Sequence, residues 1–379
     1  MNPLKALNDY GQSVWLDFLA RDFLNEGGLK RLIEQDGLRG VTSNPSIFEK
    51  AIGESGYYDA QLKQIFASGD MPVGAVYEAL AVADIQRAAD TLRPVYDATE
   101  GRDGFVSLEV SPYLALDTEK TIGEARRLWQ TVGRDNLMVK VPATAQGLPA
   151  IRQLIGEGIN VNITLLFSQD VYEEVVKAYI DGLETRAGKG GDVSRIASVA
   201  SFFVSRIDSD IDKQIDEKLE EADDPDKRKA LKSLKGKAAI ANARLAYRRY
   251  KRLFSGERWQ RLADKGGRTQ RLLWASTGTK NPDYPDVLYV DELIGPDTVN
   301  TMPPKTLDAY RDHGSPRASL EANVDEAEET LDALDRAGIS LDKVTTDLVS
   351  KGVQLFADSF GGLLGAIEAK RKQVRQAAG

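Results

Sequence analysis

The stretch "NLMVKVPATAQG", residues 136–147, places a lysine in the middle of a short apolar run that is typical of a buried strand. Lysine is among the residues least often buried unless a partner pairs with it or a reaction uses it. Side chains alternate between the two faces of a strand, so Val139 and Val141 on one face turn Lys140 to the other. Pro142 cannot donate to a sheet ladder and therefore suits the end of the strand. Which groups Lys140 contacts on this second face depends on the fold.

Apolar runs bounded by turn residues predict eight strands along the chain. They cover residues 13–19, 40–45, 105–111, 136–143, 160–168, 196–204, 271–277 and 286–293. Helix-like sequence or a loop separates each pair, and repeated strand–helix units predict a parallel sheet. Eight such units in one chain favour an α/β fold closed into a (β/α)8 TIM barrel over an open, doubly wound sheet.

We expect residues 1–379 to form one barrel domain with extra helices. Residues 207–268 are highly charged and helix-prone, with one break at "DDPD". We interpret this segment as a charged helical insertion that enlarges a pair of crossover helices.

The C-terminal residues 324–379 predict helices that pack on the barrel. Gly361 and Gly362 are expected to interrupt these helices. Phe356 and Phe360 fall on the same segment and are expected to close one end of the structure.

The composition excludes several classes of protein. Net charge is −8, and the charges alternate in sign along most of the chain, so no basic face offers itself to nucleic acid. There is no cysteine, and the single histidine, His313, lies in a predicted loop. No run approaches the roughly 18 apolar residues needed to span a membrane, so we expect a soluble, cytoplasmic protein. Chemistry would then use lysine, carboxylates and hydroxyl groups, with no metal site.

Strand alternation collects polar residues on the inner face of the predicted barrel. On this interpretation Val161, Ile163 and Leu165 take the outer face of the fifth strand. The inner face of at least six strands is polar, with Asp17 beside Trp15, Thr42, Asn44, Ser107, Glu109, Ser111, Lys140, Asn160, Asn162, Thr164, and Ser201 beside Phe203.

An interior lysine among carboxylates has the composition of a Schiff-base site. Burial disfavours the ammonium form of a lysine, and its neutral amine can attack a carbonyl carbon. Asp17 or Glu109 could then move protons during carbinolamine breakdown and carbon–carbon cleavage. The neutral side chains suit the hydroxyl groups of a sugar, and they are Asn44, Asn162, Thr164 and Ser201. Arg206, after the sixth strand, and Lys280, after the seventh, suit a phosphate group.

Each of these residues also has a purely structural interpretation. Lys140 could expose its head at a strand end or form a structural ion pair with Asp17. Arg206 could pair with Asp208 or Asp210 on an exposed helix. Glu109 could face a solvated rim, Asn162 and Thr164 could be satisfied structural groups, and Trp15 and Phe203 could fill the core.

The chain resembles the transaldolase family, in particular its longer bacterial form. The resemblance rests on "WLDFL" with Asp17, "GVTSNPSIFEKA" with Asn44, "VSLEVSPYLALDT" with Glu109, "LMVKVPAT" with Lys140, "NVNITLLFS" with Asn162 and Thr164, and "SFFVSRID" with Ser201, Phe203 and Arg206. These motifs occur in the family's order and span most of the chain, and several of them together are very specific.

The resemblance implies a class I aldolase-like barrel that transfers a dihydroxyacetone unit without a cofactor. The reaction implied takes sedoheptulose 7-phosphate and glyceraldehyde 3-phosphate to erythrose 4-phosphate and fructose 6-phosphate, in the pentose phosphate pathway. It also implies the roles of the residues: Schiff-base nucleophile, Lys140; acid and base for carbon–carbon cleavage, Asp17; holders of the catalytic water, Glu109 and Thr164; ligands of the dihydroxyacetone hydroxyls, Asn44, Asn162 and Ser201; phosphate ligand, Arg206.

One motif departs from the family. Shorter members have a Ser-Phe-Arg run after the seventh strand, whose arginine binds phosphate, whereas this chain has "ASTGTKNP". Ser276 keeps its place, and we expect Lys280 to supply the missing charge. The partners expected are sugar phosphates, with neither nucleic acid nor membrane, and the protein would be a monomer or a homodimer.

Two other functions stay open. A fructose 6-phosphate aldolase uses the same barrel and lysine, but such relatives usually carry Gln at the position of Glu109 and Tyr at that of Phe203. A non-catalytic barrel that binds sugar phosphates is a less favoured alternative, since it has no need of a buried lysine beside two carboxylates.

Overall fold

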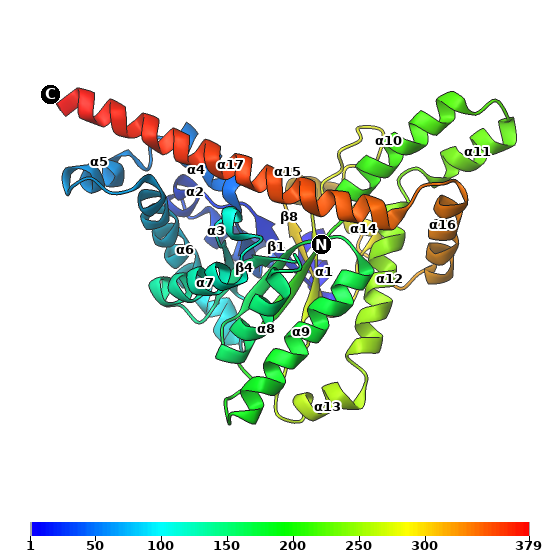
Figure 1. Cartoon of the computed structure of the whole chain (residues 1–379), viewed down its shortest axis with the longest axis horizontal. Coiled ribbons are helices and arrows are strands. Elements are labelled where there is room, and N and C mark those ends of the chain that lie inside the picture. Colours follow the sequence, from blue (N-terminus) through cyan, green and yellow to red (C-terminus); the bar gives the residue numbers. More distant parts are fainter. Residues whose placement is uncertain (1, 379) are drawn as a thin grey trace.

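The computed structural model describes residues 2–378 and contains a closed barrel of parallel strands in the order β1 to β8 (Figure 1). The strands are β1 (Gln12–Asp17), β2 (Gly40–Thr42), β3 (Phe105–Glu109), β4 (Leu137–Pro142), β5 (Val161–Leu166), β6 (Ser198–Phe203), β7 (Arg271–Ala275) and β8 (Thr298–Met302). Each strand pairs with the next, and β8 pairs with β1. The predicted (β/α)8 barrel is confirmed.

Helices surround the barrel and extend beyond it (Figure 1). In the described residues they are α1 (Pro3–Asp9), α2 (Arg21–Asn25), α3 (Gly28–Asp36), α4 (Pro45–Glu54), α5 (Asp59–Ala67), α6 (Val73–Ala98), η1 (Pro112–Leu114), α7 (Thr118–Val132), α8 (Gly147–Glu157), α9 (Gln169–Gly188), α10 (Ser205–Glu221), α11 (Pro225–Leu234), α12 (Ala238–Leu253), α13 (Glu257–Ala263), α14 (Leu288–Glu292), α15 (Pro304–His313), α16 (Val324–Arg336) and α17 (Leu341–Ala378). Among residues 2–378, no helix is long and apolar enough to cross a membrane.

The predicted eighth strand was wrong. Residues 286–293 contain the short helix α14, and the strand that closes the barrel is β8, "TVNTM". The buried residues of the predicted segment include Val287, Val290 and Leu293, whose spacing of three is helical. The true strand has only two apolar residues, Val299 and Met302, so it lacks the apolar run by which the other strands were predicted.

The charged insertion forms more helices than expected. The predicted break at "DDPD" lies between α10 and α11, where the Asp224 side chain caps α11 by accepting a hydrogen bond from the backbone of Asp226. Further breaks before α12 and α13 give four helices between Ser205 and Ala263 in place of a pair. Gly236, with φ of +71°, provides the left-handed turn that starts α12.

The last helix, α17, crosses the molecule from α16 to α4 and α5 (Figure 1). The predicted interruption at Gly361 and Gly362 was wrong, because α17 runs through both. A Cβ atom at Gly362 would lie 2.3 Å from Glu49 Oε1 on α4, so this glycine permits a close helix contact. Packing of α17 against the barrel outweighs the roughly 1 kcal/mol propensity cost of each glycine.

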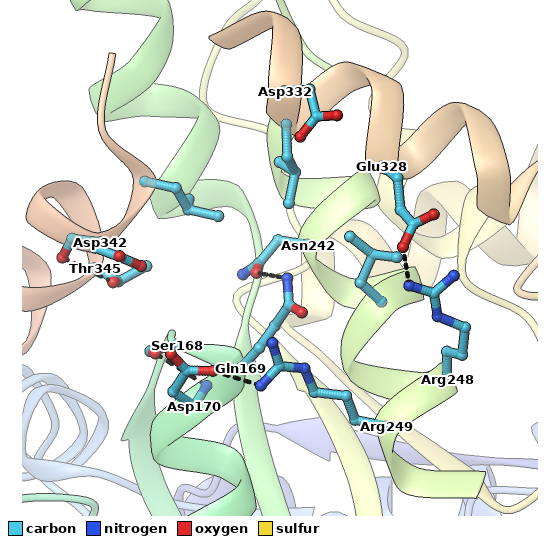
Figure 2. A pocket seen from close by; sticks show the side chains of 13 residues that line it. Ser168, Gln169, Asp170, Asn242, Arg248, Arg249, Glu328, Asp332, Asp342 and Thr345 are labelled. Carbon is cyan, nitrogen blue, oxygen red and sulfur yellow. Dashed lines mark hydrogen bonds and ion pairs between the residues drawn. The ribbon is translucent and has the colours of Figure 1, made fainter. Parts of the chain in front are cut away.

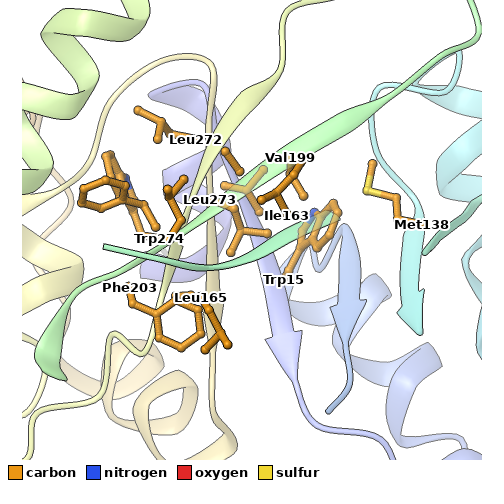
Figure 3. Packing of buried hydrophobic residues seen from close by; sticks show 14 of the residues in the cluster. Trp15, Met138, Ile163, Leu165, Val199, Phe203, Leu272, Leu273 and Trp274 are labelled. Atoms are coloured by element: carbon orange, nitrogen blue, oxygen red, sulfur yellow. The ribbon is translucent and has the colours of Figure 1, made fainter. Parts of the chain in front are cut away.

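The inner face of the barrel is polar near the C-terminal ends of its strands. Lys140 lies directly between Glu109 on β3 and Asn162 on β5 in the strand register, as alternation predicted. Leu165 is a correction, because its left-handed φ of +57° and a register shift break the alternation of β5. Leu165 and Phe203 belong to one cluster of buried hydrophobic residues (Figure 3), and the Leu165 side chain packs against α17 at Gly352.

The N-terminal end of the barrel is closed by an ion-pair network around Asp103. Arg271 Nη2 lies 2.9 Å from Asp103 Oδ1, and Arg39 Nη1 lies 3.4 Å from Asp103 Oδ2. Ser13 Oγ also donates to Asp103 at 2.8 Å, and Trp15 Nε1 donates at 3.4 Å. Asp103 is fully buried, and each of its carboxylate oxygens accepts hydrogen bonds.

Candidate active site

A cavity of about 170 Å³ lies at the C-terminal end of the barrel. Active sites of this fold lie at that end. The lining includes nine of the residues predicted from the sequence, which are Asp17, Asn44, Lys140, Thr164, Ser201, Phe203, Arg206, Ser276 and Lys280. The remaining two, Glu109 and Asn162, contact lining residues. The structure thus brings together side chains from β1 to β7 and the segments that follow them.

Lys140 is buried with its amine in contact with a carboxylate. Its Nζ lies 3.4 Å from Glu109 Oε2, and it donates a hydrogen bond of 3.2 Å to the Ser43 carbonyl oxygen. The side chain is 6% exposed, which rules out the alternative in which its head reaches solvent. The Phe356 ring centroid lies 5.8 Å from Nζ, so an aromatic face from α17 covers the amine.

The turn after β4 fixes the direction of this lysine. Gly147 begins α8 so close to the strand that a Cβ atom there would lie 2.0 Å from the Pro142 carbonyl oxygen. Thr144 Oγ1 holds the turn by donating to the Ala115 carbonyl oxygen and accepting from the Gly147 amide. The motif "KVPATAQG" is therefore a tight strand-to-helix connection that leaves Lys140 at the barrel mouth.

Asp17 lies across the cavity, and Thr42 orients it. Thr42 Oγ1 donates a hydrogen bond of 2.7 Å to Asp17 Oδ1, and it also contacts Thr301 Oγ1 at 2.7 Å. Burial raises the pKa of Asp17, while the positive charges of Lys140, Lys280 and Arg206 and the Thr42 hydrogen bond act against this rise. The carboxyl group is a candidate for proton transfer because Thr42 orients it and it lines the cavity.

Glu109 and Thr164 carry unsatisfied polar atoms beside the lysine. Burial raises the pKa of Glu109, and the neighbouring Lys140 charge opposes this. Glu109 Oε2 and Thr164 Oγ1 are both buried and have no hydrogen-bond partner within residues 2–378. Such atoms are costly in a folded protein, and here they are placed to bind a water molecule or a ligand.

Asn44 is held by the helix that it begins. Its side-chain oxygen accepts a hydrogen bond of 3.1 Å from the Ile47 amide, and Pro45 occupies the first position of α4. This explains the "SNPSIF" motif as a capped helix start. The cap uses only the oxygen, so the side-chain amide nitrogen of Asn44 stays available to a ligand in the cavity.

Asn162 lies beside Lys140 in the strand register but does not line the cavity. It is fully buried, donates 3.0 Å to Ser107 Oγ, and accepts 2.6 Å from Ser201 Oγ. These bonds join β3, β5 and β6 beneath Lys140 and set the orientation of Ser201, which does line the cavity. A direct contact between Asn162 and a substrate stays a prediction.

Arg206 and Lys280 give the cavity a cationic rim. Arg206 forms no ion pair with Asp208 or Asp210, since Asp208 accepts from Tyr289 and Asp210 pairs with Lys351. Its guanidinium group lies over the Phe203 ring, 5.5 Å from the centroid. Burial lowers the pKa of Arg206, and burial and the Arg206 charge lower that of Lys280. Two cations that repel each other at an open rim are suited to bind one phosphate between them.

Ser276 and Phe203 complete the cavity wall. Ser276 adopts a left-handed backbone with φ of +57°, and its hydroxyl contacts Ser205 Oγ at 2.9 Å. A non-glycine residue in this conformation is a strained position of the kind that occurs at ligand sites. The Phe203 ring packs 5.1 Å from Phe167, so it also belongs to the core.

Six lining residues were not predicted from the sequence, and they are Thr42, Ala275, Gly278, Thr301, Pro303 and Phe356. Thr42 had been placed on the inner face but given no role, and Phe356 had been expected only to close one end of the fold. Thr301 escaped notice because β8 was predicted in the wrong place. The segment "TVNTM" has no regular alternation of polar and apolar residues, so the sequence carries no clear signal for Thr301.

A larger cavity of about 510 Å³ lies between α9, α12, α16 and α17 (Figure 2). Its arginines are paired, Arg248 with Glu328 and Arg249 with Asp170. None of the described residues lining it is a lysine. This cavity therefore lacks the groups for covalent carbonyl chemistry. In the part of the chain that the structure describes, no group of three or more His, Asp or Glu side chains is arranged to hold a metal ion.

Known proteins are similar to this chain over nearly its whole length. A profile of the transaldolase/fructose-6-phosphate aldolase family matches residues 14–367. "Transaldolase 2" of Nostoc sp. is 50% identical over 375 residues, which is 98% of each chain. "Transaldolase 2" of Nostoc punctiforme is 51% identical over 98% of each chain, and "Transaldolase" of Thermobifida fusca is 49% identical over 96% of each. The resemblance to the longer bacterial form is thus confirmed over nearly the whole chain.

Proposed function

The chain belongs to the transaldolase/fructose-6-phosphate aldolase family, and on that premise we propose that it is a transaldolase whose Schiff base forms on Lys140. It moves a dihydroxyacetone unit from a ketose phosphate, such as sedoheptulose 7-phosphate, to glyceraldehyde 3-phosphate. Fructose 6-phosphate and erythrose 4-phosphate are the products. The observation that carries this proposal is the buried Lys140 amine beside Glu109 at the C-terminal mouth of the barrel.

The first step joins Lys140 to the substrate. The neutral amine attacks the C2 carbonyl carbon of the ketose to give a carbinolamine, and Glu109 supplies the proton with which the hydroxyl leaves as water. Thr164, whose hydroxyl has no partner among the described residues, holds this water with Glu109. The raised pKa of Glu109 favours the acid form that this step needs.

The second step breaks the carbon–carbon bond. Asp17 removes the proton from the C4 hydroxyl, and the electrons of the C3–C4 bond move into the protonated imine, which releases an aldose. The acceptor aldose then adds to the resulting enamine, and Asp17 returns its proton to the new hydroxyl. Thr42 keeps the Asp17 carboxyl group directed into the cavity through its 2.7 Å hydrogen bond.

Binding residues orient the sugar through its hydroxyls and its phosphate. Asn44 and Ser201 bind the dihydroxyacetone hydroxyls, with Asn162 either binding them or orienting Ser201. Arg206 and Lys280 hold the phosphate, and Ser276 adds a hydroxyl beside them. The two cations at the rim, Arg206 and Lys280, favour an anionic substrate.

Borohydride reduction in the presence of fructose 6-phosphate tests this proposal. The wild type should form a stable adduct that peptide mapping places on Lys140. Lys140→Ala should keep the fold, by its circular dichroism spectrum, and lose the adduct. Lys63→Ala, at an exposed lysine of α5, is the matched control and should keep it. An adduct that persists in Lys140→Ala would rule out the assignment.

Transfer and simple cleavage differ in their need for an acceptor. The presence of Glu109 and Phe203 in place of Gln and Tyr favours transfer. We therefore expect consumption of fructose 6-phosphate to depend on added erythrose 4-phosphate. Steady release of dihydroxyacetone without an acceptor, at the same rate, would instead identify an aldolase.

A further inference from the structure

A second cavity, of about 590 Å³, lies behind Glu109, between α6, α7 and the turn that follows β3. Glu109 lines it, whereas the cavity at the barrel mouth is lined by Lys140. Because Glu109 Oε2 lies only 3.4 Å from Lys140 Nζ, this ion pair is the boundary between the two cavities. Helix α17 borders both, with Phe356 at the mouth and Phe360, one turn later, at the second cavity.

Polar groups in the second cavity continue from Glu109 toward solvent. The Tyr77 ring packs 5.7 Å from Phe48 and 5.4 Å from Phe360, and burial raises the pKa of its hydroxyl. The same cavity is lined by Glu109, Glu124 and Glu78, whose charges raise that pKa further.

The outer end of this polar series reaches solvent. Glu124 accepts a 2.6 Å hydrogen bond from the Ser111 amide at the cavity wall. Glu78 pairs with Arg127, whose side chain is 50% exposed. The lining is largely apolar, but Tyr77, Glu78, Glu124 and Ser111 give it polar groups between the buried Glu109 and the surface, and such groups can hold water.

Schiff-base chemistry needs a route for water. When the carbinolamine breaks down, its C–O bond is cleaved, and the hydroxyl takes the Glu109 proton and leaves as one water molecule. The products are the protonated imine and the Glu109 carboxylate. Hydrolysis reverses this, because water adds its oxygen to the imine carbon and returns its proton to Glu109. Each transfer releases one water and consumes one.

The barrel mouth is poorly suited to that exchange while a sugar is bound. Its cavity, at about 170 Å³, is smaller than the 590 Å³ cavity behind Glu109, and a bound sugar takes that space. Phe356 covers the Lys140 amine from the same side. Apart from the Lys140 amine, Glu109 Oε2 has no polar partner within residues 2–378, so a water molecule can bind there.

We propose that the cavity behind Glu109 is a water passage, separate from the sugar entrance, through which water reaches and leaves the Schiff base. Tyr77 is a positioning residue that orients this water toward Glu109. The proposal rests on the Schiff-base function proposed above and adds a second, solvent-side opening to that site.

Oxygen exchange tests the passage. Fructose 6-phosphate labelled with ¹⁸O at C2 loses its label to ordinary water each time a Schiff base forms and is hydrolysed, which mass spectrometry can follow. Gly74 lines the cavity, and a Cβ atom there would meet nothing within 4 Å, so Gly74→Trp adds bulk without a local clash. Gly123→Trp, at a glycine of α7 with equally open surroundings outside the cavity lining, is the matched control.

Label loss should slow by about an order of magnitude in Gly74→Trp and stay at the wild-type rate in Gly123→Trp. Transfer should slow in parallel, because each turnover uses the same water steps. The amount of adduct that borohydride traps at equilibrium should not change, since a passage alters rates only. Tyr77→Phe, which keeps the ring contacts, should show a smaller slowing of the same kind.

The outcomes separate the two proposals. Failure of the wild type to form a Lys140 adduct or to exchange oxygen would contradict the proposed function itself. A wild type that does both, with label loss unchanged in Gly74→Trp, would overturn the passage alone. A reduced equilibrium adduct in Gly74→Trp would also overturn it, because it would show a distorted lysine site.

Discussion

The two ends of the barrel each bury an ion pair, and the two pairs differ in how fully hydrogen bonds satisfy them. At the N-terminal end, Asp103 lies 2.9 Å from Arg271 and accepts further hydrogen bonds from Ser13 and Trp15. At the C-terminal end, Lys140 and Glu109 are 3.4 Å apart, and Glu109 Oε2 has no hydrogen-bond partner in residues 2–378. The buried carboxylate is thus fully hydrogen-bonded at the N-terminal end and only partly hydrogen-bonded at the C-terminal end.

This difference indicates that the ion pair at the N-terminal end serves stability, whereas the pair at the C-terminal end serves function. A buried charge is tolerated when its lone pairs and protons are satisfied, and the N-terminal network meets that condition. At the C-terminal end, Glu109 Oε2 and the Thr164 hydroxyl have no hydrogen-bond partner within residues 2–378. This lowers the stability of the fold, and the packing of the rest of the barrel offsets the loss. A substrate and its water can supply the missing partners, so the incomplete end is the reactive one.

Removing the charge of Asp17 should give the largest change in activity at the C-terminal end. Asp17→Asn keeps the size of the side chain and can still contact Thr42, but it cannot take the C4 hydroxyl proton. We expect kcat to fall about 10²- to 10⁴-fold with little change in KM. Borohydride should still trap the Lys140 adduct in this variant, and loss of the adduct would instead give Asp17 a role in Schiff-base formation.

Removing the matching carboxylate at the N-terminal end should act on stability. Asp103→Ala leaves Arg271 buried without its partner, and breaking a buried pair in this way costs about 3–5 kcal/mol. Urea unfolding should show this loss, while kcat per folded molecule stays at the wild-type value. A variant with normal stability and reduced kcat would contradict the division between the two ends.

The rim cations should contribute less than either carboxylate. Arg206→Met and Lys280→Met each remove one phosphate ligand, at about 1.5–3 kcal/mol for a hydrogen bond to a charged group. KM for fructose 6-phosphate should therefore rise more than tenfold in each variant, and kcat should change little. Lys305→Met, at an exposed lysine on α15, is the control. An unchanged KM in Lys280→Met would show that Arg206 binds the phosphate without Lys280.

The sequence predicted the reactive end better than the segments that cover it. Alternation within β4 was enough to turn Lys140 inward, because one strand carries that information locally. It failed at Leu165, where a left-handed backbone breaks the period of two, and at β8, whose polar residues conceal a strand. Phe356 covers Lys140 from the last helix, a contact set by tertiary packing that no local pattern encodes.

The smallest expected effect is a gain in stability when the charge of Asp17 is removed. Burial raises the pKa of Asp17, so the folded protein binds this proton more tightly than the unfolded chain does. The wild type therefore loses stability as pH rises above the ordinary value of 3.8, until the folded carboxyl is ionised. Asp17→Asn has no such loss.

Urea unfolding at several pH values should show this difference in the pH dependence of the free energy of unfolding. The two proteins should be equally stable near pH 3, and Asp17→Asn should become the more stable one as pH rises toward neutrality. Asp103→Asn, which weakens a satisfied pair, should be less stable than the wild type at neutral pH. If Asp17→Asn were also destabilised there, the positive charges of Lys140, Lys280 and Arg206 would outweigh burial at Asp17. The C-terminal end would then be as well satisfied as the N-terminal one.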